Sequence, residues 1–227
     1  MLRQLADDLW VVERSLRFAG LEVGTRMSIV RLRDGGLFLH SPVALDGALR
    51  DALAALGPAR AAVAPNRFHH LYIGAYREAF PAIQLFAAPG LAEKRRDVRF
   101  DGVLDRDDAP AAWAGEIDQA VVRGFPMINE VAFCHRASRT LLVADLAVNL
   151  KSDAPLLTRI VFGLLAGYGR FGPTLAERVL VRDRAAARAA LERILSWDFD
   201  RVVLAHGHIL EHGGPAELRR GYGWLLR

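Results

Sequence analysis

The chain has 227 residues, of which 52% are hydrophobic, so it can build the core of one α/β domain spanning residues 1–227. Its net charge of +4 comes from arginines spread among acidic residues, without a basic stripe interleaved with aromatics, which argues against nucleic-acid binding. The single cysteine, Cys134, excludes an intrachain disulfide and a cysteine-rich zinc module, and it fits a reducing compartment such as the cytoplasm.

The first part of the chain predicts antiparallel strands. Residues 10–12 and 28–33 are rich in β-branched and apolar residues, and Asp34-Gly-Gly36 before Leu37-Phe-Leu39 is typical of a tight hairpin turn. The N-terminal residues reach Asp7 and Asp8 before any long apolar run, which argues against a secretory signal.

Helices and short buried strands then alternate. Leucines at helical spacing predict a helix over residues 46–56, which ends at Gly57-Pro58. The elements expected next are a strand over residues 61–64, a helix over 75–80, a strand over 83–86 and a charged surface loop over 93–110.

The second half predicts another hairpin, formed by residues 131–133 and 140–143, and later a helix capped by Asp183. The apolar run over residues 160–168 is about half the length of roughly 20 residues that a membrane span needs, so we expect a buried helix or a flap. A last strand ends before His206. This order of elements favours two mixed sheets packed face to face with helices outside.

Three of the expected strands lead to side chains that can bind a metal. Ala61–Ala64 leads to His69 and His70, the strand over 141–144 leads to Asp145, and the strand over 202–205 leads to His206. Buried strands can bring such residues to one edge of a sheet, and imidazole with carboxylate is ordinary ligand chemistry for zinc or iron. The sequence therefore predicts a site for one divalent metal, zinc in preference to iron.

Several stretches resemble the metallo-β-lactamase superfamily over nearly the whole chain. They are Leu37-Phe-Leu-His-Ser-Pro42, Ala64-Pro-Asn-Arg-Phe-His-His70, Leu142-Val-Ala-Asp145 and Val203-Leu-Ala-His-Gly207. Residues 65–70, 129–135 and 138–145 are more narrowly similar to a branch of that superfamily described as a domain of unknown function. The resemblance implies a four-layer αβ/βα sandwich and metal-dependent hydrolysis.

The superfamily's motif, His-x-His-x-Asp-His, serves two metals, and only part of it is present. If His70 matches the last His and His69 the Asp, the first two histidines are replaced by Pro65 and Arg67. The resemblance then implies that the first metal site is lost and that the second keeps His69, His70, Asp145 and His206. A competing register places His69 on the second motif His and Tyr72 on the last.

The resemblance also draws attention to Glu130, which lies where a ligand of the first metal is expected. Glu130 could form an ion pair with Arg67 in place of that metal, or act as a general base beside Asp145. We expect the ion pair.

Three further histidines have supporting roles in this interpretation. His40 occupies a position where the superfamily orients a ligand, whereas His135, in a predicted turn, is either exposed or functional. His208 lies on the opposite side of its strand from His206, so we expect it to support a ligand or face solvent.

The sequence thus predicts a mononuclear metal-dependent hydrolase of an ester, thioester, lactone or phosphoester bond. The alternative is a degenerate, metal-free protein that keeps the fold and binds a small molecule without turnover. In either case the expected partner is a small molecule, with no nucleic acid and no membrane span.

Overall fold

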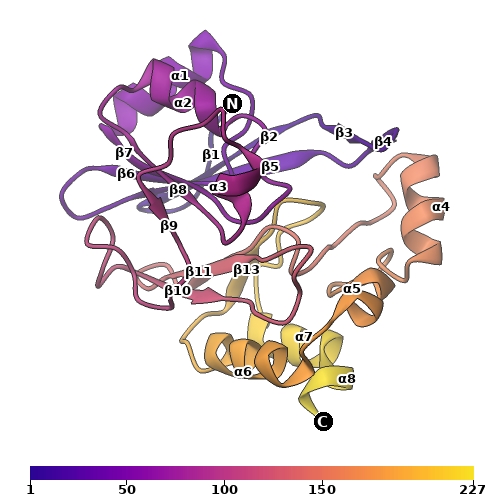
Figure 1. The fold of residues 1–227 in the computed structure, drawn as a ribbon. Helices are drawn as coiled ribbons and strands as arrows, with labels where there is room; N and C mark the ends of the chain where they lie inside the picture. Colours follow the sequence, from indigo (N-terminus) through magenta and orange to yellow (C-terminus); the bar gives the residue numbers. More distant parts are fainter.

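Two β-sheets lie face to face at the centre of the molecule, and helices cover the outer face of each (Figure 1). The computed structural model describes residues 1–227. The four layers are helices, a seven-stranded sheet, a four-stranded sheet and helices, which confirms the predicted αβ/βα sandwich.

The first sheet contains seven strands in mixed orientation. In spatial order they are β1 (Arg3–Ala6), β2 (Leu9–Arg14), β5 (Thr25–Arg31), β6 (Leu37–His40), β7 (Ala59–Ala64), β8 (Gln84–Ala87) and β9 (Gly102–Val103). The neighbours β1, β2, β5 and β6 pair antiparallel, and the neighbours β6, β7, β8 and β9 pair parallel. Helices α1 (Gly47–Leu56) and α2 (Ile73–Ala79) lie on its outer side, and Asp46 caps α1 by accepting from the Leu49 backbone N–H.

The second sheet contains four strands, and its last two run parallel. In spatial order they are β10 (Ile117–Val121), β11 (Val131–His135), β12 (Thr140–Leu142) and β13 (Arg201–Val203). Leu142 pairs with Val203, so the segments that follow β12 and β13 leave the same edge of the sheet. Helices α6 (Arg184–Leu195), α7 (Gly214–Gly221) and α8 (Gly223–Leu226) cover its outer face, and Asp183 caps α6 as predicted.

Aromatic side chains fill the space between the sheets. The Phe38 ring lies 4.9 Å from the Trp113 ring and 5.4 Å from the Phe133 ring, measured between centroids, and all three side chains are buried. One further apolar cluster packs the first sheet against α1 and α2, and another packs the second sheet against the helices on its outer face. This packing holds the strand ends rigidly, which is what a site built on them requires.

The sequence interpretation missed several elements, among them the hairpin of β3 (Arg17–Phe18) and β4 (Leu21–Glu22) and the helices α3 (Leu91–Lys94) and α5 (Leu175–Leu180). The stretch expected as a charged surface loop over 93–110 contains β9, which pairs with β8 at the edge of the first sheet, so that expectation is wrong in part. The run expected as a buried helix or a flap lies in and after α4 (Leu156–Leu164), whose Ile160 and Leu164 are exposed, so the buried helix is wrong. No helix has the length and apolar character needed to cross a membrane.

The β3–β4 hairpin extends toward α4 (Figure 1). The Thr158 hydroxyl on α4 donates to the Glu22 carbonyl at 2.8 Å. Hairpin and helix are therefore joined, and they stand beside the edge where the strand ends meet.

Candidate metal centre

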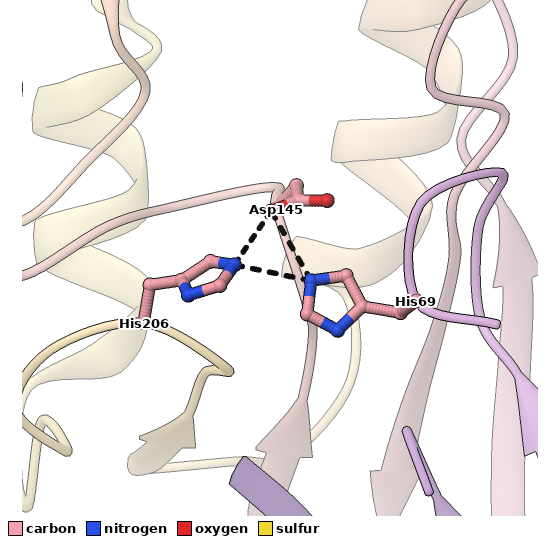
Figure 2. A group of neighbouring side chains, drawn as sticks. All are labelled: His69, Asp145 and His206. Atoms are coloured by element: carbon pink, nitrogen blue, oxygen red, sulfur yellow. Dashed lines mark hydrogen bonds and ion pairs between the residues drawn. The ribbon is translucent and has the colours of Figure 1, made fainter. Parts of the chain in front are cut away.

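His69, Asp145 and His206 converge on one point (Figure 2). The two histidine Nε2 atoms are 3.1 Å apart, and Asp145 Oδ1 lies 3.5 Å from Nε2 of His69 and 3.3 Å from Nε2 of His206. His69 comes from the loop after β7, Asp145 from the segment after β12 and His206 from the segment after β13. The two sheets thus contribute to one cluster at their shared edge.

Neighbouring groups orient both imidazoles. His206 Nδ1 lies 2.9 Å from the Gly24 carbonyl, which can only accept, so Nδ1 carries the proton and Nε2 keeps its lone pair toward the cluster. His69 Nδ1 lies 2.8 Å from the Ser41 hydroxyl, which orients the ring so that its Nε2 faces the cluster. Three electron-pair donors therefore point at one another, an arrangement that needs a shared proton or a metal cation between them.

The charges of the cluster are mutually dependent. Burial alone would raise the pKa of Asp145, but His69 and His206 hold it well below its usual range. Burial alone would lower the pKa of His206, yet the hydrogen bond and the charge of Asp145 outweigh it and raise that pKa. The cluster therefore keeps a carboxylate beside an imidazole that readily takes a proton.

Asn66 fixes the position of Asp145. Its Nδ2 donates to Asp145 Oδ2 at 2.7 Å and to Glu130 Oε2 at 3.2 Å, and its Oδ1 accepts from the backbone N–H groups of Phe68 and His69. The side chain is fully buried. One amide thus ties the loop that carries His69 to the carboxylate that His69 faces.

Glu130 lies behind Asp145 rather than beside the open side of the cluster. Its carboxylate accepts from the backbone N–H groups of Ala144 and Asp145, both at 2.7 Å, and it is 1% exposed. Burial and the charge of Asp145 raise the pKa of Glu130. The contacts make Glu130 a support for the Asp145 backbone and leave it no path to a substrate, so the structure does not place it as the suggested general base.

The separations in the cluster fit a single tetrahedral metal. With metal–ligand bonds of about 2.0–2.1 Å, donor atoms stand about 3.3–3.4 Å apart in a tetrahedron and about 2.9 Å apart in an octahedron. The three separations of 3.1, 3.3 and 3.5 Å lie around the tetrahedral value. His69, Asp145 and His206 form a candidate metal site.

Two sequence expectations around this site are wrong. His70 does not join Asp145 and His206, because its Nδ1 lies 2.9 Å from the Arg95 guanidinium, which also donates to the His70 carbonyl. Arg67 does not pair with Glu130. Its guanidinium donates to the Pro126 carbonyl at 3.3 Å, and Asn66 is the residue that contacts Glu130 instead.

None of His40, His135 and His208 contacts the cluster. His40 makes no contact that orients a ligand, since its buried Nε2 lacks a hydrogen-bond partner; the neighbouring Ser41 orients His69 instead. His135 is buried at the end of β11 rather than exposed in a turn as expected; it pairs with Thr140, at the end of the sheet away from Asp145, and contacts Ser138. His208 is exposed and binds Asp153 at 2.8 Å.

Sequence reasoning missed the residues that hold the loops. Arg26 is buried, and its guanidinium donates to the carbonyls of Leu204 and Gly207, which lie on either side of His206, while Glu13 neutralises its charge at 2.9 Å. An arginine in a strand of buried residues was the available signal, because an arginine is rarely buried without a partner. Its partners lie about 180 positions further along the chain and could not be read from spacing.

The buried His40 predicts acid sensitivity. Burial, with a smaller effect of the His69 charge, lowers the pKa of His40 to about 3, so the folded protein keeps this imidazole neutral. The unfolded chain binds a proton there with a pKa near 6.5, so the free energy of unfolding falls as the pH drops below that value. Lowering the pH from 7 to 5 should cost about 2 kcal/mol of unfolding free energy through this residue. Urea unfolding with chelator present should show an acid loss that is about 2 kcal/mol larger in the wild type than in His40→Leu, since His70, whose pKa burial lowers to about 4, contributes equally to both.

His212 supplies the matched control for that measurement, because it is exposed and binds only Asp200. His212→Leu should keep the acid loss of the wild type. An equal pH dependence in wild type and His40→Leu would contradict the assignment.

A cavity of about 460 Å³ opens onto the cluster. His69, Asp145 and His206 all line it, together with residues of the β3–β4 hairpin, the loop after β7, the loop before β11, α4 and α5. Its volume is within the range typical of small-molecule sites. Glu130 does not line it.

Residues 6–163 match the family described as a domain of unknown function, DUF4336. The chain belongs to this family. No curated protein matches the sequence. The assignment of this DUF4336 protein to a family therefore names no substrate.

Solved structures establish the fold of the DUF4336 chain. It is similar to a metallo-β-lactamase from Pontibacter korlensis (TM-score 0.67, 14% identity, 99% of this chain and 98% of that chain covered) and to one from Hirschia baltica (0.66, 12%, 100% and 97%). It is also similar to the metallo-β-lactamase FIM-1 from Pseudomonas aeruginosa in the mono-zinc form (0.64, 12%, 100% and 92%). The resemblance seen in the sequence is confirmed at the level of the fold.

Proposed function

We infer that this protein holds one divalent metal, zinc in preference to iron, through His69, Asp145 and His206, and that it hydrolyses an ester, thioester, lactone or phosphoester bond. One observation carries the proposal: three donor atoms of the cluster face one another at near-tetrahedral separations. The near-tetrahedral spacing favours zinc, which prefers four ligands, over an octahedral iron site.

Three protein ligands are the number that catalytic zinc sites use, since they leave one position for water or substrate. A metal held there would supply an activated water and polarise the bond to be cleaved. The chain's own residues supply the geometry. Gly24 and Ser41 set the imidazole orientations, and Asn66 holds Asp145 with one oxygen toward the cluster. The apolar walls of the cavity limit the access of bulk water.

The comparison with FIM-1 supports a single-metal site in this fold, because that structure is described as a mono-zinc form. The contacts in this chain supply the specific reason. Pro65 and Arg67 occupy the positions where the superfamily's first two histidines are expected, and neither provides imidazole. Four-coordinate binding at the remaining site requires no second metal.

Metal analysis and turnover test the proposal together. The purified protein should contain about one equivalent of zinc, and activated esters, thioesters or lactones should be hydrolysed slowly. Dialysis against a chelator should remove both metal and turnover, and added zinc should restore both. Because a proton competes for His206 and its raised pKa favours that proton, metal affinity should fall as the pH is lowered.

A stable protein that takes up no zinc and is inert toward esters, thioesters, lactones and phosphoesters would contradict the hydrolase proposal. That result would favour the alternative, a protein that uses the cavity for binding without turnover.

A further inference from the structure

The cavity beside the cluster has apolar walls. Thirteen of its 22 lining residues are hydrophobic, and they come from segments far apart in the sequence. Those that matter for the argument are Phe18, Phe68, Met127, Ile128, Phe162 and Leu165. A ligand that fills this volume must therefore present mainly apolar surface to the protein.

The charged side chains on the walls are already bound to other parts of the protein. Lys94 Nζ donates to the Arg67 carbonyl at 2.7 Å, and His70 contacts Arg95. Glu177 accepts from the Thr174 hydroxyl, and burial raises its pKa. Outside the cluster, the cavity thus offers little to a ligand with several charged groups.

The absence of arginine from the walls is informative in a chain so rich in it. The cavity is lined by no arginine and by a single lysine, although Lys and Arg number 30 in the chain. Phosphate recognition in proteins relies on such cations. The walls therefore disfavour a phosphoester and favour an uncharged carbonyl substrate.

The apolar lining continues to the surface at the mouth of the cavity. Phe18, Leu71 and Met127 line the cavity and are also 58%, 54% and 52% exposed. Large apolar side chains gathered at one opening are unfavourable in water, and a ligand that covers them recovers that free energy. A chain longer than the cavity can leave through this mouth against apolar surface.

We propose that the substrate is an acyl ester or thioester whose acyl group is a linear aliphatic chain of medium to long length. This rests on the proposed hydrolase function. The carbonyl lies at the cluster and the chain lies in the cavity, against the residues of the β3–β4 hairpin and α4 that line it. Water adds to the acyl carbon and the bond from that carbon to oxygen or sulfur breaks. The products are the carboxylic acid and the alcohol or thiol, which takes up the proton released by the water.

A series of p-nitrophenyl esters from acetate to decanoate, each below its micelle concentration, tests the proposal. Burial of each added methylene should raise kcat/KM by about two- to fourfold until the cavity is full. A flat or falling series, with turnover of the acetate intact, would overturn the acyl proposal and leave the hydrolase proposal standing.

Binding of fatty-acid anions distinguishes failure of the hydrolase proposal from failure of the apolar-ligand assignment. Calorimetric affinity should increase from butyrate to decanoate in the wild-type protein. Length-dependent binding without any turnover would overturn the hydrolase function and keep the apolar ligand. Affinity that does not depend on length would overturn the ligand assignment.

Two adjacent leucines provide matched variants. Leu165 lines the cavity, whereas its neighbour Leu164 is 77% exposed and does not. Leu165→Glu should lower the ratio of kcat/KM for decanoate over acetate at least tenfold, because a carboxylate then lies on the path of the chain. Leu164→Glu should keep the wild-type ratio. Equal changes in both variants would show an effect of surface charge and would contradict the proposal.

Discussion

Replacing His69 with alanine should weaken metal binding by more than about 100-fold, the upper end of the loss seen when a residue that only supports a ligand is removed. His69 is expected to be a ligand itself, since its Nε2 faces both His206 and Asp145. Metal content after gel filtration should fall from about one equivalent to nearly none, and ester turnover should disappear with it. Circular dichroism should remain that of a folded protein, because the buried clusters between the sheets and under the helices hold the fold without the metal.

His70 is the matched control for this variant, because it is the same residue type one position along. Its ring nitrogen contacts Arg95, away from the cluster. His70→Ala should keep the metal and most of the turnover. If instead His70→Ala lost the metal and His69→Ala kept it, the arrangement of the cluster would be wrong and the register with His70 as a ligand would be supported.

Replacing Asn66 with alanine should lower the free energy of unfolding by about 3–4 kcal/mol, the largest effect on stability that we expect from a residue that is not itself a proposed ligand. The change removes the donor to the buried carboxylate of Glu130 and the half-buried carboxylate of Asp145, and the acceptor for two backbone N–H groups. Groups left buried without partners cost more than the hydrogen bonds themselves contribute. Urea unfolding of the metal-free protein at pH 7 measures the loss.

Asn149 provides the comparison for that loss. It is also buried, but its side chain donates one hydrogen bond, to the His208 carbonyl at 2.9 Å. Asn149→Ala should cost about 1 kcal/mol. If both variants lost the same small amount, Asn66 would not be the residue that holds the two carboxylates.

The strand ends were the part of the site that the sequence could predict. Short apolar runs end before Asp145 and His206, and parallel pairing of β12 with β13 places both residues at one edge. A short run of apolar residues that ends at a polar residue is typical of a buried strand, so this pattern can be recognised without the structure. The same holds for the caps of α1 and α6, where an aspartate precedes a run at helical spacing.

The choice between His69 and His70 needed the structure. Neighbouring residues in a loop point in different directions, and spacing does not say which direction is toward the cluster. Asn66 fixes the loop by accepting from the His69 backbone N–H, and Arg95 contacts the ring of His70 away from the cluster. Arg95 lies 25 positions along the chain and gave no signal of this contact.

The sequence by itself determined the sandwich of two sheets and the residue types of the site, because hydrophobic periodicity and strand ends are properties of short segments. Only the tertiary structure decided which side chains meet and what surrounds them. Glu130 became a buried support, Ser41 took the orienting role expected of His40, and the α4 segment proved to be a wall of the cavity. These outcomes depend on contacts between distant segments, whose geometry is set by the packing of the whole core rather than by local pattern.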